Sequence, residues 1–412
     1  MKNKIHHLLA DFNHETPHLT FETISELGKE SLTHLLSILM EENNQIGEAA
    51  AWVIGEFRDN RAVQTLIKIL NIPDNQTRSH AIWALSKIKN TDAVPALISM
   101  LTDADFDIRI AAAGALGKIG DLRAIKPLIE SLNDDNSRVC DYSCASLQQI
   151  GMPAKDQLIT ALENKNAKTI KYVVRCLKAM PFDNVLNSLE SVVDYDDADV
   201  RSEVMDTLSA FDTKPAIDLL INGLIDKSVK VRRQSAISLG DRNNTRVLEA
   251  LGKALADNAD IVKINALRSL GKTPNALSFS YISKSIIDNS PKVRVEALHA
   301  LSNFKESQSL PFILPMITDE SNDVCKTAIL MLGSIGNDQA IDGLLKALND
   351  DRLEIRSFAV INLGKIAAIK AIEPLRLALK NADTRMIGLI NTAIRKIEAR
   401  NSKKTKIAAD NR

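Results

Sequence analysis

The sequence predicts an all-α fold, an α-α superhelix of about 11 to 12 two-helix repeats with a period of 31 residues. Three observations lead to this prediction. An apolar residue, Leu116 in the clearest repeat, returns at a fixed spacing along the chain. Two segments with helical apolar periodicity accompany each of these residues. Aromatic residues make up only 4% of the chain, which favours many small aliphatic cores over one large core.

Each repeat has an anchor, the apolar residue that defines the period. The spacing between anchors is 31 residues throughout, except for 30 residues between Leu147 and Leu177. Gly or Ser follows most anchors, as expected where a neighbouring helix comes close. The anchors are Ile54, Leu85, Leu116, Leu147, Leu177, Leu208, Leu239, Leu270, Leu301, Leu332, Leu363 and Ile394.

Residues 102–132 contain the elements of one repeat in order. Apolar positions at i, i+3, i+4 and i+7 predict an Ala-rich helix that carries the anchor Leu116. A polar turn leads into a second apolar segment with Pro127 near its start, where a missing N–H costs little. Each repeat is therefore two antiparallel helices. One pair cannot cover its own apolar face, so the pairs must stack into a continuous core.

The repeats divide the chain into three parts. Residues 1–40 are expected to form an N-terminal cap with a degenerate first repeat, and residues 41–397 the repeat array. Residues 398–412 are expected to be a flexible basic tail. The first and last repeats must differ from the others, because they close the stacked core.

A basic residue and an aspartate recur at fixed positions. In the repeat of Leu116 these are Arg109 and, six residues earlier, Asp103. We expect a row of ion pairs within and between the repeats, which explains both residues without a ligand. Function is therefore sought where the repeats differ from one another.

The pattern of residues 108–120, with close versions at 231–240 and 355–366, resembles the HEAT repeat. It is most similar to the short form named after phycobilisome lyases, the PBS lyase HEAT-like repeat. The resemblance covers about residues 45–397 and implies an α-solenoid whose Ala-rich helices line the concave side. It implies much less about function, because such arrays serve many unrelated tasks.

The face of the Ala-rich helix that points away from the stack holds the candidate binding residues. Both tryptophans fall at one position of this face in adjacent repeats, and two of the four tyrosines fall at another. Ala111 and Gly114 leave a floor without side chains between them. Aromatic faces beside basic residues suit an extended peptide or a planar anionic ligand. The candidates for partner or ligand binding are Trp52, His80, Trp83, Arg138, Tyr142, Lys168, Tyr172 and Arg175.

Two alternatives remain open for this face. Trp52 and Trp83 could simply pack on each other and fill the groove. Near the C-terminus the same face becomes apolar, and there it could contact a partner or a second copy of the chain, with ordinary packing at the end of the array as the alternative. The apolar residues are Leu330, Phe358, Ile361 and Leu389.

Composition and motifs exclude several function classes. Basic and acidic residues balance at 52 each, which argues against nucleic acid and anionic membranes as partners. No apolar run reaches the roughly 18 residues of a membrane helix. Four cysteines without a C-x-x-C pair fit a reducing, cytoplasmic location. The early histidines, such as His14, have no metal-binding spacing, and phosphate-binding loops and nucleophile motifs are absent, so we expect no metal, cofactor or catalytic residue.

The sequence favours a non-enzymatic scaffold or adaptor that binds another protein along the concave face. The resemblance to phycobilisome lyases implies an alternative, a bilin lyase or bilin chaperone acting on phycobiliproteins. In that case the Trp and Tyr faces would hold the pyrroles, and Arg138 or Arg175 the propionates. A third hypothesis, a HEAT-like DNA glycosylase, needs a basic concave track, which acidic residues such as Asp107 and Asp199 interrupt.

Overall fold

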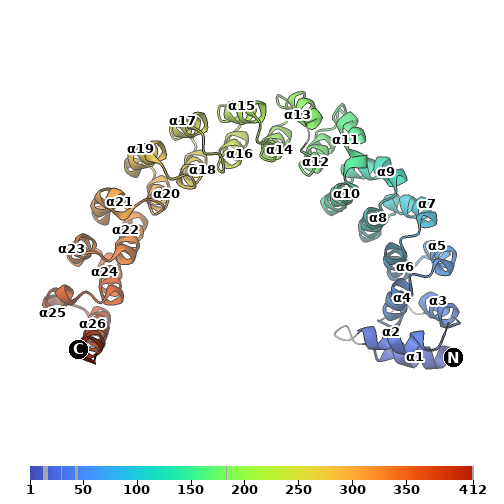
Figure 1. Cartoon of the computed structure of the whole chain (residues 1–412), viewed down its shortest axis with the longest axis horizontal. Coiled ribbons are helices and arrows are strands. Elements are labelled where there is room, and N and C mark those ends of the chain that lie inside the picture. The colour runs from blue at the N-terminus through green and yellow to red at the C-terminus, as the bar shows by residue number, and fades with distance from the viewer. Residues whose placement is uncertain (13–16, 29, 42–44, 182, 411–412) are drawn as a thin grey trace. The chain divides into compact units, whose positions relative to one another are not determined.

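The computed structural model describes residues 1–12, 17–28, 30–41, 45–181 and 183–410. These residues form α-helices and short 3-10 helices and contain no β-strand, which confirms the predicted all-α fold (Figure 1). The chain divides into two compact units, unit 1 (Met1–Ala216) and unit 2 (Ile217–Arg412), and the division falls within helix α15.

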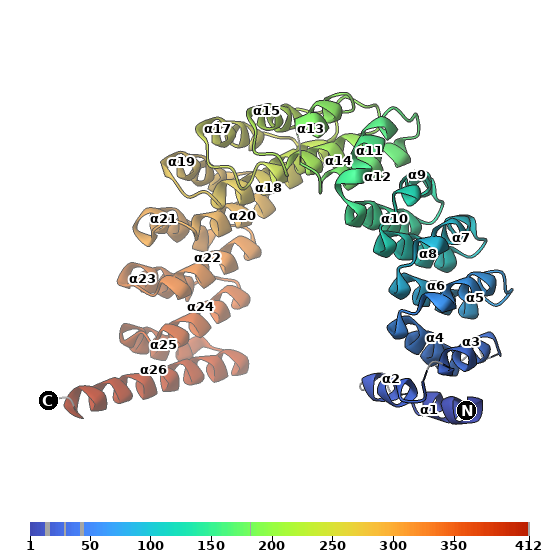
Figure 2. The ribbon, with the colours of Figure 1, turned by 45° about the vertical axis from the view of Figure 1, so that its right-hand side comes forward.

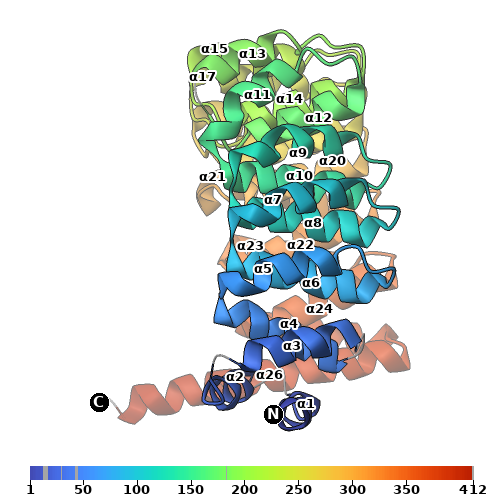
Figure 3. The ribbon, with the colours of Figure 1, turned by 90° about the vertical axis from the view of Figure 1, so that its right-hand side faces the viewer.

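Unit 1 is a stack of helix pairs that follow one another in chain order (Figure 3). Within this unit the even-numbered helices from α4 onward lie on the concave side and the odd-numbered helices on the convex side (Figure 1). The helices are α1 (Lys2–Ala10), α2 (Pro17–Ser25), α3 (Ser31–Glu41), α4 (Gln45–Phe57), α5 (Val63–Ile69), α6 (Asn75–Ile88), α7 (Val94–Ser99), α8 (Phe106–Ile119), α9 (Ile125–Glu130), α10 (Ser137–Ile150), α11 (Lys155–Ala161), α12 (Ala167–Leu177), α13 (Asp183–Glu190), α14 (Ala198–Leu208) and α15 (Lys214–Gly223).

Unit 2 repeats the same arrangement of helices. Its even-numbered helices lie on the concave side of the unit, and its pairs stack one on the next (Figure 2). The helices are α16 (Val229–Ser238), α17 (Thr245–Ala254), α18 (Asp260–Gly271), α19 (Ala276–Lys284), α20 (Pro291–Leu301), α21 (Glu306–Ile313), α22 (Asn322–Ile335), α23 (Asp338–Ala347), α24 (Leu353–Ile366), α25 (Ile372–Ala378) and α26 (Thr384–Asp410).

The anchors form the centre of each stacked core. Ile54 and every anchor from Leu85 to Leu363 have no exposed surface, and the terminal anchor Ile394 keeps 9%. The small residues that follow the anchors face the next even-numbered helix. A β-carbon on Gly117 would lie 2.6 Å from the Ser146 Cβ, so a larger side chain there would push α8 and α10 apart.

The row of ion pairs predicted from the repeating Arg and Asp is present. Arg109 donates from Nε and Nη2 to the Asp134 carboxylate of the next repeat, at 2.7 and 2.8 Å. Its Nη1 donates to the carbonyl oxygen of Asp103 in its own repeat, at 2.8 Å. Each pair therefore ties one repeat to the next. Equivalent pairs are Arg78 with Asp103, Arg232 with Asp257, Lys263 with Asp288, and Arg294 with Asp319.

Two cysteines, Cys140 and Cys325, stand at row positions that Arg occupies elsewhere. The Cys325 thiol donates to the carbonyl oxygen of Asp319 at 2.9 Å. Arg352 from the following repeat reaches back and donates to the same carbonyl at 2.9 Å and to the Cys325 Sγ at 3.2 Å. The Arg352 guanidinium therefore takes the place of the Arg side chain that other repeats carry at the Cys325 position.

Two features differ from the repeat as read along the sequence. α8 packs against α7, the helix before it, so residues 102–132 begin in the middle of a structural pair. At the C-terminus the backbone of α26 is helical as far as Asp410 and therefore includes most of the expected tail, residues 398–412. Residues 411–412 and His14 lie outside the described residues. The three domain boundaries stay predictions.

Candidate protein-binding face

The eight candidate residues all lie on even-numbered helices at the concave side of unit 1. We call this surface the N-terminal inner face and define it by those eight residues together with Phe106. Trp52 lies on α4, His80 and Trp83 on α6, Phe106 on α8, Arg138 and Tyr142 on α10, and Lys168, Tyr172 and Arg175 on α12.

Trp52 belongs to an aromatic cluster at the N-terminal end of this face. Its ring centroid is 5.7 Å from that of Phe12 and 6.4 Å from that of Phe21, and Phe21 lies 5.4 Å from Phe57. The cap, α1 and α2, packs against α4 and supplies two of these rings. Trp52 is half-buried as a result, so it contributes to the packing of the cap.

Trp83 and His80 are also half-buried. The Trp83 ring fills the space beside Gly55, where a β-carbon would lie 2.8 Å from Cζ3. The Lys87 ammonium lies 5.1 Å from the centroid of the same ring and pairs with Glu56 at 2.9 Å. Burial lowers the pKa of His80, although nearby carboxylates act in the opposite direction.

Arg138, Tyr142 and Phe106 form the exposed part of the face. The Arg138 guanidinium lies 6.0 Å from the Phe106 ring and 3.4 Å from the Asp107 carboxylate, and its side chain is 60% exposed. Tyr142 is 47% and Phe106 39% exposed. The expected floor without side chains is covered, because the Tyr142 ring lies 3.8 Å from where a β-carbon of Gly114 would stand.

Arg175 holds three consecutive even-numbered helices together. Its Nε and Nη2 donate to Glu203 on α14 at 2.9 and 3.0 Å, and Nη1 donates to Asp141 on α10 at 3.1 Å. The hydrogen bonds to Glu203 raise the pKa of Arg175, against a smaller opposing effect of burial. The guanidinium also covers the Tyr172 ring at 4.9 Å from its centroid.

Tyr172 and Lys168 are less available than the sequence indicates. Tyr172 is only 7% exposed, so it differs from the exposed aromatic face expected of it. Burial raises the pKa of its phenol, and the Asp141 carboxylate adds to this. Lys168 donates from Nζ to the backbone carbonyl of Asp134 on the preceding repeat. Arg175 therefore links α12 to α10, and Lys168 links α12 to the turn before α10.

Sequence reasoning missed two features of this region. The first feature is Phe106, which lies one residue before Asp107 and is exposed beside Arg138. The second feature is a pair of cysteines, because Cys176 on the next even-numbered helix places its Sγ 2.6 Å from the Cys144 Sγ. A second cysteine 32 residues along a 31-residue period was the signal.

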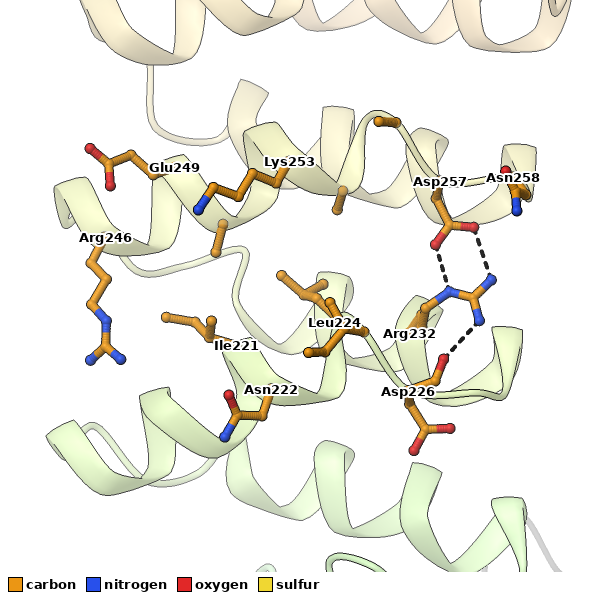
Figure 4. A pocket seen from close by; sticks show the side chains of 14 residues that line it. Ile221, Asn222, Leu224, Asp226, Arg232, Arg246, Glu249, Lys253, Asp257 and Asn258 are labelled. Carbon is orange, nitrogen blue, oxygen red and sulfur yellow. Dashed lines mark hydrogen bonds and ion pairs between the residues drawn. The ribbon is translucent and has the colours of Figure 1, made fainter.

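Two cavities lie between outer helices, away from this face. In unit 2 a cavity of about 690 Å³ lies between α15 and α17, and Arg232 closes one end of it (Figure 4). Arg232 is already bound to Asp257 and to the carbonyl of Asp226. A cavity of about 620 Å³ between α7 and α9 is closed by Arg109 in the same way. These cavities recur with the repeat. The Arg residue of the ion-pair row that closes each of them is already paired, so it offers no free cation to a ligand.

Two further properties bear on the kind of site. Among the residues that the structure describes, no three His, Cys, Asp or Glu side chains gather closely enough to hold a metal ion. None of the described helices is both long and apolar enough to span a membrane.

Comparison with solved structures finds chains of similar fold. Kap121p is 14% identical, with a TM-score of 0.57 over 98% of this chain and 54% of Kap121p. Kap121p bound to Nup53p gives 0.58 at 13% identity over 98% and 54%. Kap121p bound to the extreme C-terminus of the protein phosphatase Cdc14p gives 0.59 at 13% identity over 95% and 53%. At such identities the likeness concerns the fold alone, and this chain spans about half the length of Kap121p.

The sequence comparisons gave two results. No curated protein matches the chain. The family model for HEAT repeats matches six overlapping segments, residues 31–107, 66–148, 155–240, 217–285, 281–363 and 324–393, which together cover most of the chain. With its buried anchors, its stacked helix pairs and these six matches, the chain belongs to the HEAT-repeat family.

Proposed function

We propose that this protein is a non-enzymatic scaffold or adaptor that binds another protein on the N-terminal inner face. One observation carries the proposal: Phe106, Arg138 and Tyr142 lie exposed on the adjacent helices α8 and α10. Aromatic and Arg side chains supply most of the binding energy in protein interfaces, because they bury a large area at a small entropic cost. Three such residues together are more than stacking of the repeats requires.

The other candidates act indirectly in this proposal. Trp52 packs under the N-terminal cap and Arg175 is bound to Glu203 and Asp141, so both shape the face. Contact with the partner then centres on α8 and α10. The solved structures of similar fold include Kap121p bound to Nup53p and to RanGTP, which agrees with a fold suited to protein partners.

The bilin alternative has less support. A bilin would need exposed rings for its pyrroles and free cations for its propionates. Tyr172 is buried, and the guanidinium of Arg175 already has carboxylates on both sides. The phycobilisome-lyase-like subtype of the repeat and the cytoplasmic location remain predictions from the sequence.

The test is affinity capture with matched variants. Arg138→Glu combined with Tyr142→Ala removes the exposed charge and ring without opening the core. Leu122→Ala is the control, because Leu122 is 58% exposed on a short 3-10 helix at the start of an outer helix. We expect proteins enriched by wild type and by the control to be lost from the double variant, with an unchanged melting temperature. Equal enrichment by all three chains would refute the proposal.

Trp52→Ala separates the structural part of the face from the binding part. Truncating a ring packed against Phe12 and Phe21 leaves a cavity, and we expect a loss of about 2–4 kcal/mol in the free energy of unfolding. If this variant kept its stability and lost the partner, Trp52 would be a contact residue instead.

A further inference from the structure

Unit 2 exposes an apolar surface on its concave side. We call it the C-terminal apolar stripe and define it as Leu330, Phe358, Ile361 and Leu389. Leu330 is 49% and Ile361 50% exposed, while Phe358 and Leu389 are half-buried. Leu330 and Ile361 hold equivalent positions in successive repeats, so the stripe crosses the axes of α22, α24 and α26, which lie in order in Figure 2.

A cavity opens beside the stripe. It has a volume of about 390 Å³ and lies between α20, α21 and α22. Leu330 and Met331 line it on one side, and Phe304, Ile313 and His299 line it on the other. A cavity of this size accepts a large apolar side chain, and such an anchor gives an interface much of its affinity.

Three cations on the concave side carry free charge beside the stripe, while Glu306, a carboxylate that lines the cavity, belongs to the outer helix α21. Lys365, Arg385 and Lys396 are exposed, and none of them has an ion pair with a residue that the structure describes. Three other cations of this concave side are neutralised by a carboxylate of a neighbouring repeat. These are Arg268 with Glu296 at 2.8 Å, Lys272 with Asp241 at 3.0 Å and Lys326 with Glu354 at 2.5 Å.

We propose that the C-terminal apolar stripe binds an amphipathic helix of a partner protein, with acidic residues flanking the apolar face of that helix. The apolar face would cover Leu330 and Ile361, and the carboxylates would meet Lys365, Arg385 and Lys396. Free cations beside exposed apolar groups favour this charge pattern, because like charges would raise the cost of association. The surface is separate from the N-terminal inner face and does not depend on its proposed role.

The chemistry of the stripe selects a helix over an extended peptide. An extended segment must hydrogen-bond its backbone to the groove that receives it, whereas a helix satisfies its own backbone. The nearby amide of Asn362 is buried and donates to the carbonyl of Phe358 at 2.8 Å, so it is already used. Neighbouring helices pack about 8–10 Å apart, which matches the roughly 10.5 Å between residues i and i+7 of a helix.

The experiment uses two synthetic helical peptides and the full chain. One peptide carries Leu on one face and Glu on both flanks, and the other has Lys in place of every Glu. Fluorescence anisotropy should show that the acidic peptide binds and that the Lys peptide binds at least about tenfold more weakly. Ile361→Glu should weaken the acidic peptide about tenfold, and Lys365→Glu with Lys396→Glu should reverse the preference.

Controls separate this proposal from its rivals. Leu377→Glu places the same charge on a residue that is 60% exposed on the outer helix α25, and binding should persist. Absence of binding, equal binding of both peptides, or equal weakening by Leu377→Glu would overturn the proposal. So would a dimer in sedimentation that Ile361→Glu dissociates, since the occupant would then be a second copy. Arg138→Glu with Tyr142→Ala should leave peptide binding intact, which keeps this test distinct from that of the proposed function.

A second, independent observation concerns the junction of α10 and α12. Cys144 and Cys176 place their sulfur atoms 2.6 Å apart, and both side chains are buried. This junction is the one where the anchor spacing is 30 residues, and it lacks a row pair, since Cys140 and Asn164 occupy the Arg and Asp positions. Two thiols in contact at a junction without its usual cross-link are placed to be joined covalently.

We infer that Cys144 and Cys176 form a disulfide when the chain meets an oxidising low-molecular-weight disulfide such as oxidised glutathione. One protein thiolate attacks that disulfide and releases one glutathione thiolate. The second protein thiolate then attacks the mixed disulfide and releases the other glutathione. Two protein thiols are oxidised, one glutathione disulfide is reduced, and the two S–H protons pass to the released thiolates. Burial slows the reaction, because the thiolate must form in a transient opening of the helix pair.

Intact mass and peptide mapping test this inference. The full chain in oxidised glutathione should lose about 2 Da and yield a Cys144–Cys176 peptide. Cys140→Ser should behave like wild type, because Cys140 faces the carbonyl of Asp134 at 3.3 Å. Cys176→Ser should keep three free thiols and form no internal link. A disulfide to Cys140, a stable glutathione adduct on Cys144, or four free thiols after prolonged oxidation would overturn it.

Discussion

Arg232 allows a direct measurement of how much the row of ion pairs stabilises the array. Its guanidinium donates to both oxygens of Asp257 at 2.5 and 3.0 Å and to the carbonyl of Asp226 at 2.8 Å (Figure 4). The side chains of Arg232 and Asp257 are only 15% and 8% exposed. Arg232→Met removes the charge and leaves the carboxylate buried. We expect a loss of about 3 kcal/mol in the free energy of unfolding, the low end for a broken buried pair, because some contact with water remains.

The effect should depend on pH in a defined direction. Burial by itself would raise the pKa of Asp257, but the hydrogen bonds from Arg232 and from the Ala259 N–H outweigh it and hold the pKa below its usual value. In wild type the pair therefore stabilises the fold above about pH 4, and this contribution is lost as the pH falls through the lowered pKa. In the variant the unpaired buried carboxylate gains protons more readily, so the difference from wild type is largest near neutral pH and shrinks on acidification.

Urea unfolding near pH 7 and near pH 3 measures the difference, and hydrogen exchange locates it on α16 and α18, since repeat arrays open locally. Arg246→Met is the matched control. Arg246 pairs with Asp218 at the surface, with 56% and 35% exposed side chains, and should lose less than about 1 kcal/mol. The reasoning fails if the two variants lose equal stability, or if the loss for Arg232→Met does not change with pH.

Four further substitutions test the packing. Leu270→Ala should cost about 2–5 kcal/mol, because this anchor has no exposed surface; an unchanged urea midpoint would contradict its role. Gly117→Val should cost about 1–3 kcal/mol, since a β-carbon there lies 2.6 Å from a side chain of α10, whereas Gly388→Ala, with open space around it, should gain up to about 1 kcal/mol. Arg352→Ala should cost about 2 kcal/mol by emptying the row position beside Cys325, and equal thermal stability would argue that this contact is weak.

The sequence was sufficient for the fold because burial follows the period. Once Leu116 is known to recur with the same neighbours, the apolar residues at i, i+3, i+4 and i+7 place every anchor in the core. The sequence did not predict which helices pair. A period fixes the length of a repeat and leaves its starting point open, so the packing of α8 on α7 could not be read from it.

The sequence placed the candidate residues on one side of the array. It did not predict which neighbours bury or pair each side chain. Trp52 is covered by Phe12 and Phe21, which precede the regular repeats, so no offset relates them. The pair of Arg175 and Glu203, in contrast, has a spacing of 28 residues, and that spacing recurs between other cations and acids of neighbouring even-numbered helices. Opposite charges 28 residues apart were a usable signal for inter-repeat pairs.

The Arg352 side chain limits how the array can be cut into exchangeable modules. Its guanidinium serves the carbonyl of Asp319 and the thiol of Cys325, which belong to the repeat before its own. A designer who grafted the repeat of Cys325 beside a foreign neighbour would leave that carbonyl without its guanidinium donor, and a grafted Arg352 would meet an Arg where it now meets a thiol. These two repeats are therefore best transplanted together, as one cassette.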